Sequence, residues 1–187
     1  GNEPVRQFVI DNAHQWLVEY GVDGLRLDAV HALVDGSETH ILAELSTKVA
    51  EWSTQIGRPL TLIAESDLNQ PDMVTPVGVT EGSRGMTMQW DDDIHHSLHA
   101  FFTGETDGYY SDFGTAETLA KAFTKVFVHD GGWSSFREQN WGAPVDPNST
   151  HYDAASFVSF FEDHDQVGNR AAGDRPGHNG ADPNIQA

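Results

Sequence analysis

Apolar side chains recur every three or four residues in four stretches of the chain, which is the spacing of one face of an α-helix. These stretches are residues 4–20, 41–56, 94–102 and 116–129. Pro4 suits the first turn of the first helix, and the Gly131-Gly132 pair suits the end of the last one. The pattern therefore predicts four amphipathic helices.

Short polar side chains precede two of these helices. Ser37 or Thr39 is placed to cap the helix over residues 41–56, and one of Asp91, Asp92 and Asp93 is placed to cap the next. Such side chains accept hydrogen bonds from the first free N–H groups of a helix. We therefore expect both helices to begin close to these residues.

Short apolar runs alternate with the helices. They cover residues 24–28, 60–65, 85–90 and 154–161, and a loop rich in Gly, Pro and aromatic residues covers 132–153. Strands that alternate with helices indicate βαβ units and a parallel sheet. The chain is therefore predicted to be an α/β protein of parallel strands alternating with helices. Its turn-rich tail from residue 173 offers no strand to close the sheet.

Three of the apolar runs lead into a carboxylate, namely Asp28, Glu65 and Asp165. In parallel α/β folds the ligand site lies at the carboxyl ends of the strands, so these acids are expected to converge on one cleft. A single acid after a strand is more often a helix cap or a solvated loop residue. The coincidence of three favours a functional site.

Arg26 supports this interpretation, because side chains two positions apart in a strand point to the same face. Its guanidinium can hold Asp28 ionised, as a nucleophile requires. Retaining glycoside hydrolysis needs a nucleophile and an acid about 5 to 5.5 Å apart. Asp28 and Glu65 end consecutive strands, and neighbouring strands lie about 4.8 Å apart. Asp165 can then steady the developing positive charge, and His164 can donate a hydrogen bond to a sugar hydroxyl.

The sequence around these acids resembles the α-amylase family of glycoside hydrolases. Three segments look like its signature regions: Asp23-Gly-Leu-Arg-Leu-Asp-Ala-Val-His31, Ile63-Ala-Glu-Ser-Asp67 and His164-Asp165. Within that family the chain is most similar to the maltooligosyltrehalose trehalohydrolases. That likeness rests on Leu62-Ile-Ala-Glu-Ser-Asp-Leu-Asn69, Gln89-Trp-Asp-Asp-Asp-Ile-His-His96, Thr103-Gly-Glu-Thr-Asp-Gly-Tyr-Tyr110 and Asp165-Gln-Val-Gly-Asn-Arg170.

The resemblance implies a role for each matched position. Asp28 would be the nucleophile, Glu65 the acid and base, and Asp165 the group that stabilises the transition state. The implied reaction is retaining hydrolysis of the α-1,4 bond next to a terminal trehalose unit, which releases trehalose from a maltooligosyl chain. Substrate contacts are expected from seven further residues: Arg26, His31, Asp67, Asp92, His96, His164 and Gln166.

The resemblance also implies a partial (β/α)₈ TIM barrel. Residues 1–187 would form the central part of a single catalytic barrel domain, from about the fourth strand to the seventh, truncated at both ends. The family's first signature region would then be missing. Because four barrel strands alone leave sheet edges uncovered, we expect the isolated chain to be poorly active or inactive.

Two positions depart from the family pattern. Asp163 stands where the family usually has Asn before His-Asp, and Asp91 stands where it usually has Asn after Gln-Trp. Neither position is an expected catalytic acid, so the chemistry is not excluded. A second negative charge beside Asp165 can still raise a local pKa.

Composition narrows the partners. The net charge of -19 comes from 10 basic and 29 acidic residues, a balance that repels phosphate backbones and anionic lipids. We therefore expect no nucleic acid or membrane partner, whereas a neutral maltooligosaccharide needs no counter-charge. The absence of Cys fits a reducing compartment, and with no visible signal peptide the chain is expected to be cytoplasmic. No cofactor is expected, and the oligomeric state is not indicated.

Two other features have competing interpretations. His95 and His99 share a helix face as zinc ligands can, but no Glu stands at the intervening position of a metalloprotease motif, and no metal is expected. Loop aromatics either stack on sugar rings or pack under the long loop, and the sequence favours neither reading. These aromatics are Trp90, Tyr109, Tyr110, Trp133, Phe136 and Trp141.

Two alternative functions remain open from the sequence. A glucan branching enzyme would use the same acids and transfer the glycosyl group to a sugar hydroxyl instead of water. A noncatalytic carbohydrate-binding barrel would not require all three acids. The presence of the complete set argues against the noncatalytic barrel, whereas the choice between water and a sugar acceptor depends on cleft shape, which the sequence does not give.

Overall fold

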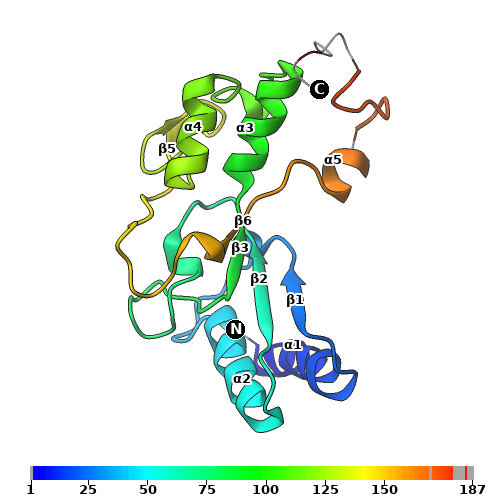
Figure 1. Cartoon of the computed structure of the whole chain (residues 1–187). Helices are drawn as coiled ribbons and strands as arrows, with labels where there is room; N and C mark the ends of the chain where they lie inside the picture. Colours follow the sequence, from blue (N-terminus) through cyan, green and yellow to red (C-terminus); the bar gives the residue numbers. More distant parts are fainter. Residues whose placement is uncertain (1, 169, 179–183, 185–187) are drawn as a thin grey trace. The chain divides into compact units, whose positions relative to one another are not determined.

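The computed structural model describes residues 2–168, 170–178 and 184 (Figure 1). The chain forms two compact units. Unit 1 consists of Gly1–Ser66, Pro71–Trp90 and Asn148–Val158. Unit 2 consists of Asp67–Gln70, Asp91–Pro147 and Ser159–Ala187.

Unit 1 contains a four-stranded parallel sheet in the order β1-β2-β3-β6 (Figure 1). Its strands are β1 Gly24–Leu27, β2 Thr61–Glu65, β3 Met88–Trp90 and β6 Phe157–Val158. The strands of the sheet lie side by side in chain order, as they do in a (β/α)₈ barrel. The predicted α/β fold with parallel strands is therefore confirmed.

The last strand is shorter than the predicted run over residues 154–161. The Asp153 side chain accepts a hydrogen bond of 2.8 Å from the Ala155 N–H and caps the 3₁₀-helix η5, Ala154–Ser156. This local cap competes with extended backbone, so the strand begins only after it.

Two helices of unit 1 lie against the sheet. α1 Glu3–His14 continues into the π-helix η1 Gln15–Glu19, and α2 Ile41–Ile56 has the predicted bounds. The short 3₁₀-helices η2 Val30–Ala32 and η3 Pro71–Met73 follow β1 and β2. The core of the unit is built from helix and strand residues, including Leu17, Leu42, Leu45, Val49, Leu62 and Ala64.

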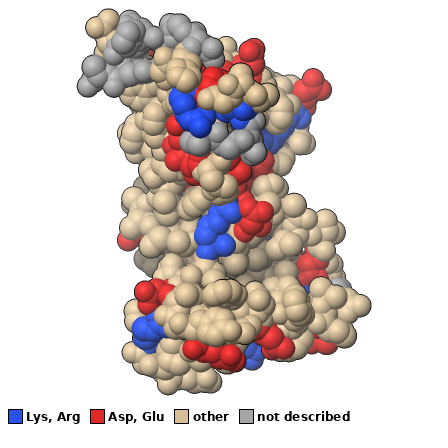
Figure 2. Space-filling view, turned by 90° about the vertical axis from the view of Figure 1, so that its right-hand side faces the viewer, with Lys and Arg blue, Asp and Glu red and all other residues tan. Residues whose placement is uncertain are grey.

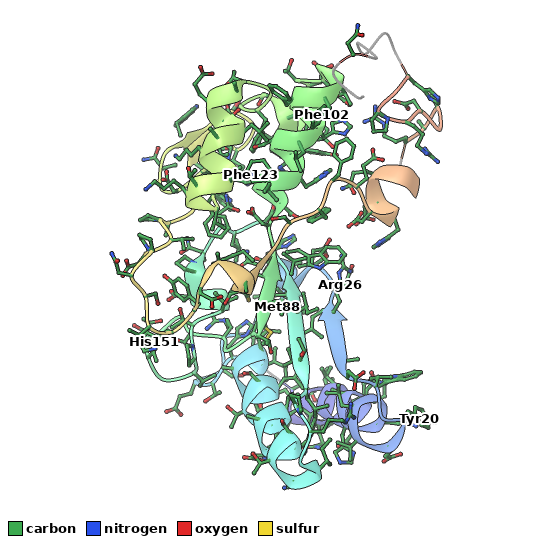
Figure 3. All side chains as sticks on the ribbon, in the orientation of Figure 1. Tyr20, Arg26, Met88, Phe102, Phe123 and His151 are labelled. Atoms are coloured by element: carbon green, nitrogen blue, oxygen red, sulfur yellow. The ribbon has the colours of Figure 1, made fainter. Side chains whose placement is uncertain are left out.

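Part of the predicted apolar face of α1 and η1 is exposed. Ile10, Ala13 and Leu17 are buried, in line with the helical spacing. Four other apolar side chains of the two helices are exposed: Val5, Phe8, Val9 and Trp16. Tyr20, which follows η1, is exposed as well (Figure 3), whereas Val18 is half-buried against the core. Only one side of the predicted apolar face, the one that carries Ile10, Ala13 and Leu17, is therefore buried in the core of unit 1.

The predicted cap of α2 is wrong. The Leu42 N–H donates to His40 Nδ1 at 3.2 Å, and the Ile41 N–H donates to Asp35 Oδ2 at 2.8 Å. Asp35 also pairs with the buried Arg6 of α1. The side chains of His40 and Asp35 therefore accept the hydrogen bonds that were expected to go to Ser37 or Thr39.

Unit 2 is mainly helical. It contains α3 Asp92–Thr103, the 3₁₀-helix η4 Gly108–Tyr110, α4 Ala116–Lys125 and α5 His164–Gly168. The predicted loop over residues 132–153 contains an antiparallel pair, β4 Trp133–Ser134 and β5 Gln139–Asn140.

The start of α3 agrees with the sequence prediction, whereas the end of α4 does not. Asp91 caps α3, because its side chain accepts a hydrogen bond of 3.3 Å from the Ile94 N–H, as predicted. α4 ends at Lys125, earlier than the predicted 129, because Val126 adopts a φ of 70° that no α-helix can continue through.

Among the described residues, no helix is both long and apolar enough to cross a bilayer. Acidic side chains outnumber basic ones on the face that Figure 2 presents, in keeping with the net charge of -19.

Candidate active site

The register of the sheet brings Asp28 and Glu65 together. Leu27 of β1 pairs in parallel with Ala64 of β2, so the two acids are the next residues on neighbouring strands. Strands in a sheet lie about 4.8 Å apart. The two acids therefore occupy the same level at the carboxyl end of the sheet, where Figure 3 also shows Arg26.

Arg26 joins the two acids. Its Nη1 atom donates to Asp28 Oδ1 at 2.6 Å. Its Nη2 atom lies 2.8 Å from Glu65 Oε1 in an ion pair whose angle is not that of a hydrogen bond. The Glu65 side chain is 18% exposed and that of Asp28 is 77% exposed. The contact with Asp28 was expected from the sequence, but the contact with Glu65 was not.

The second oxygen of Glu65 is held by the backbone. The Ala29 N–H donates to Glu65 Oε2 at 2.6 Å, and Ala29 has a φ of 43° in the left-handed region. The turn after β1 is thereby tied to the last residue of β2. Sequence reasoning missed this contact, because a backbone donor has no residue-type signal.

Trp90 packs against Arg26. The guanidinium carbon lies 4.3 Å from the centre of the indole ring, and Trp90 pairs with Glu65 in the register of β2 and β3. A cation over an indole face is held by the ring quadrupole. Of the two readings of this aromatic, the structure therefore supports packing.

Asp165 lies in α5, within unit 2. Asp163 Oδ1 accepts from the Asp165 N–H at 2.8 Å, and Gln166 Oε1 accepts from the Asp163 N–H at 2.9 Å. The Asp that replaces the family's usual Asn thus caps α5, a task that both residue types perform. His164 Nε2 lies 3.7 Å from Asp165 Oδ1. Convergence of Asp165 with the two acids of unit 1 stays a prediction.

A small cavity of about 90 Å³ lies beside Asp165. It is lined by Asp165 and Gln166 of α5 and by Tyr109, Tyr110 and Arg170. Gln166 is one of the expected substrate contacts. Arg170 closes the Asp-Gln-Val-Gly-Asn-Arg motif but was not among the predicted site residues.

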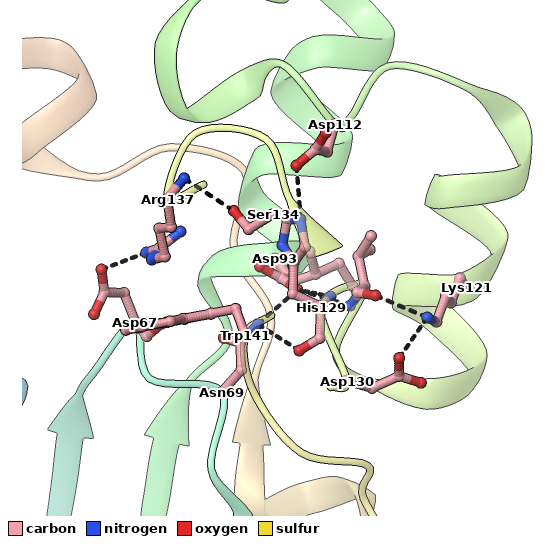
Figure 4. Close-up of polar contacts among 12 residues, drawn as sticks. Asp67, Asn69, Asp93, Asp112, Lys121, His129, Asp130, Ser134, Arg137 and Trp141 are labelled. Carbon is pink, nitrogen blue, oxygen red and sulfur yellow. Dashed lines mark hydrogen bonds and ion pairs between the residues drawn. The ribbon is translucent and has the colours of Figure 1, made fainter. Parts of the chain in front are cut away.

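Asp67 is held in place by the loop that carries β4 and β5 (Figure 4). Arg137 Nη2 donates to Asp67 Oδ2 at 2.5 Å, and Trp141 Nε1 donates to the Asp67 carbonyl at 2.7 Å. The Arg137 guanidinium lies over the Trp141 ring at 4.5 Å. Arg137 was not predicted, and no motif around it pointed to this pairing.

The other predicted contacts fall in three places. His31 is exposed in η2, beyond Asp28. Asp92 is the first residue of α3. His96 packs between Tyr109 and Phe113, with ring centres 5.1 and 5.2 Å away. Burial holds the pKa of His96 well below its usual 6.5, so its imidazole is neutral at neutral pH.

The remaining loop aromatics of unit 2 divide by exposure. Tyr110 is buried, whereas Tyr109, Trp133 and Phe136 are exposed and Trp141 is half-buried. Packing is therefore the role of Tyr110. Tyr109 also packs despite its exposure, because its ring centre lies 5.1 Å from that of His96 and 4.5 Å from that of Tyr110.

His95 and His99 have protein partners. His95 Nδ1 lies 2.6 Å from the Phe161 carbonyl, and His99 Nε2 lies 2.8 Å from Glu105 Oε2. Within the part of the chain that the structure describes, no group of three or more His, Cys, Asp or Glu residues could hold a metal ion. These contacts engage one ring nitrogen of each histidine.

Burial of His95 predicts a loss of stability in mild acid. Burial lowers the pKa of His95 to about 4, against 6.5 in an unfolded chain. Between pH 6.5 and pH 4 His95 is protonated in the unfolded state but not in the folded state. The free energy of unfolding therefore falls progressively as the pH is lowered from 6.5 to 4. The full loss is about 3 kcal/mol, of which about 2 kcal/mol falls between pH 7 and pH 4.5. Urea denaturation at pH 7 and pH 4.5 measures it.

The matched variant for this experiment is His95→Asn, which keeps a donor and cannot titrate. Its free energy of unfolding should fall less than that of the unaltered chain over the same pH interval. Equal falls in the two proteins would contradict the prediction, because all other titrating groups are shared.

No protein-family model matches the chain. Over 174 residues it is 52% identical to the malto-oligosyltrehalose trehalohydrolase of Arthrobacter ramosus, covering 93% of this chain and 29% of that protein. It is 49% identical over 175 residues to the enzyme of the same name from Rhizobium sp. (strain M-11), covering 94% and 29%. The chain is a homologue of these trehalohydrolases.

A solved structure supports the same conclusion for the fold. The chain matches a crystal structure from Salmonella typhimurium that bears the name of an alpha amylase, with a TM-score of 0.79 and 37% identity. The match covers 92% of this chain and 29% of that one. The resemblance to the α-amylase family and the partial (β/α)₈ barrel are therefore confirmed. The chain spans less than a third of the length of these trehalohydrolase relatives.

Proposed function

We propose that these residues form the central part of a catalytic barrel, about its fourth to seventh strands, in a retaining glycoside hydrolase that releases trehalose from malto-oligosyltrehalose. The observation that carries the proposal is the contact of one guanidinium with two carboxylates: Arg26 binds Asp28 and Glu65 at the carboxyl end of a parallel sheet. The sequence identity to the trehalohydrolases supports the choice of substrate.

The two acids divide the chemistry. Asp28, exposed and paired with a cation, attacks the anomeric carbon and forms a glycosyl ester while the bond to the leaving oxygen breaks. Glu65 gives its proton to that leaving oxygen, so the sugar departs as an alcohol. Water then attacks the anomeric carbon of this ester and breaks its bond to the Asp28 oxygen, while Glu65 takes up a proton of the water, so Asp28 is released as a carboxylate.

The remaining predicted residues bind the sugar. Asp165 stabilises the positive charge that develops at the anomeric carbon, and His164 and Gln166 beside it bind hydroxyl groups. We assign the other hydroxyl contacts to His31, Asp67, Asp92 and His96. A neutral glucan carries no charge for these groups to repel, which fits an acidic chain.

A chimeric enzyme tests the proposal. The matching segment of the Arthrobacter ramosus trehalohydrolase is replaced by this chain, to which it is 52% identical. Incubation with malto-oligosyltrehalose should release free trehalose, measured by chromatography. A folded chimera that made new branch points instead would support transglycosylation, and one that bound glucan without turnover would support a noncatalytic barrel.

A further inference from the structure

Two histidines of α3 are linked to the two ends of the segment that carries Asp165, His95 directly and His99 through Glu105. His95 and His99 lie one helical turn apart, with ring centres 6.1 Å from each other, and both are buried. A buried face of a helix is usually built from apolar side chains. The presence of two polar imidazoles on this buried face therefore requires an explanation, which the proposed chemistry does not provide.

His95 binds the segment just before α5. Its Nδ1 atom lies 2.6 Å from the carbonyl oxygen of Phe161, and since a carbonyl only accepts, Nδ1 carries the proton. Its ring stacks on that of Phe160, with centres 5.0 Å apart and planes 9° apart. The backbone before Asp165 is therefore fixed to α3 by a hydrogen bond and a ring contact.

His99 binds the segment just after α5 through a carboxylate. Its Nε2 atom lies 2.8 Å from Glu105 Oε2, and Arg170 Nη1 lies 3.0 and 3.2 Å from the two oxygens of Glu105. Burial opposes ionisation of Glu105, but the hydrogen bonds from His99 and Arg170 lower its pKa below the usual value. Arg170 also binds Asp174 at 2.5 Å. A chain of polar contacts through Glu105 and Arg170 thus joins α3 to the residues that follow α5.

Asp165 lies between these two attachments. Tyr110 stacks on His99 at 4.4 Å and lines the cavity beside Asp165, together with Arg170. The hydrogen bond from the Asp165 N–H to Asp163 Oδ1 joins two residues at the start of α5, so it shapes that turn and makes no contact with α3.

We propose that His95 and His99 are positioning residues, which set the place of Asp165 by holding the chain before and after α5 on α3. The proposal rests on the function proposed above for the role of Asp165 in the transition state. It also gives a role to three residues of the motif segments that have no part in the assigned chemistry, namely His95, Glu105 and Arg170.

The test exploits the different reach of two amides. The side-chain amide of Asn can replace the Nδ1 donor of His, and that of Gln can replace the Nε2 donor. His95→Asn and His99→Gln therefore keep the observed contacts, whereas His95→Gln and His99→Asn place the donor wrongly. All four are made in the chimeric trehalohydrolase, and kcat and KM for malto-oligosyltrehalose are measured.

Misplaced donors should lower kcat by about 10- to 100-fold with KM within about twofold, because a shift of about 1 Å at a reacting group costs that much. The matched variants should stay within about threefold of the unaltered kcat. Equal losses in all four variants, or none in any, would overturn the proposal.

Amide hydrogen exchange of this chain separates the proposal from the proposed function. In His95→Gln, exchange over residues 159–174 should become at least about tenfold faster, while β2 stays protected. Unchanged exchange in that segment would refute the attachment. An inactive unsubstituted chimera would refute the proposed function, and the exchange result supports or refutes the attachment in either case.

Discussion

Asp28→Asn in the chimeric trehalohydrolase should lower kcat by at least about 10³-fold. The amide has the same size as the carboxylate and can still accept the hydrogen bond from Arg26, which is 2.6 Å long in the unaltered chain. It carries no negative charge, however, and is therefore a poor nucleophile toward an anomeric carbon. The binding of substrate by other groups is retained, so KM should change far less. Initial rates of trehalose release measure both constants.

Asp11→Asn is the matched control. Asp11 is an exposed carboxylate of α1 that accepts a hydrogen bond of 2.7 Å from Gln7, and the same chemical change there should leave kcat within about twofold. Trehalose release that continued undiminished in Asp28→Asn would remove Asp28 from the role of nucleophile.

Gly142→Ala should destabilise unit 2 by about 3 kcal/mol or more. A Cβ atom at this position would lie 2.0 Å from the His129 carbonyl oxygen and 2.8 Å from Asn69 Cβ. Neither neighbour can retreat easily, because Asn69 Nδ2 binds both the buried Asp93, at 2.8 Å, and the His129 carbonyl (Figure 4). Thermal and urea denaturation of the chain measure the loss.

Gly104→Ala separates this clash from the cost of the backbone. Gly104 follows α3 with a φ of 73°, close to the 77° of Gly142, but a Cβ there would meet nothing within 4 Å. It should cost about 1 to 2 kcal/mol, the penalty of a left-handed residue with a side chain. Similar losses in the two variants would show that the backbone conformation alone matters at Gly142.

Periodicity predicted the regular elements well and their ends less well. The bounds of α2 match the apolar spacing, because the helix buries one face along its whole length. Prediction failed where a local side chain or a backbone angle decides, as at Asp153 before β6 and at Val126 after α4. Such details change no hydrophobic pattern, so the pattern cannot reveal them.

The sequence predicted the acids of the candidate site, but not the groups that bind and position them. A carboxylate at the end of a strand is visible in the sequence, and the register of β1 and β2 then brings Asp28 beside Glu65. The contacts of the Ala29 N–H with Glu65 and of Arg170 with Glu105 depend on how loops fold back, which residue type does not encode.

The exposure of the apolar residues of α1 could not be predicted either. The spacing of apolar residues shows which side of a helix they share, but not which part of the protein covers that side.

The double contact of Arg26 has a consequence for how the proposed reaction is balanced electrically. Before the first step Asp28 is anionic and Glu65 carries a proton; after it, Asp28 is esterified and Glu65 is anionic. One guanidinium that reaches both residues is therefore always opposite a single negative charge, first on one strand and then on the next. The summed charge of Arg26, Asp28 and Glu65 is therefore zero before and after each half-reaction, and no counter-ion has to enter or leave to balance these three residues.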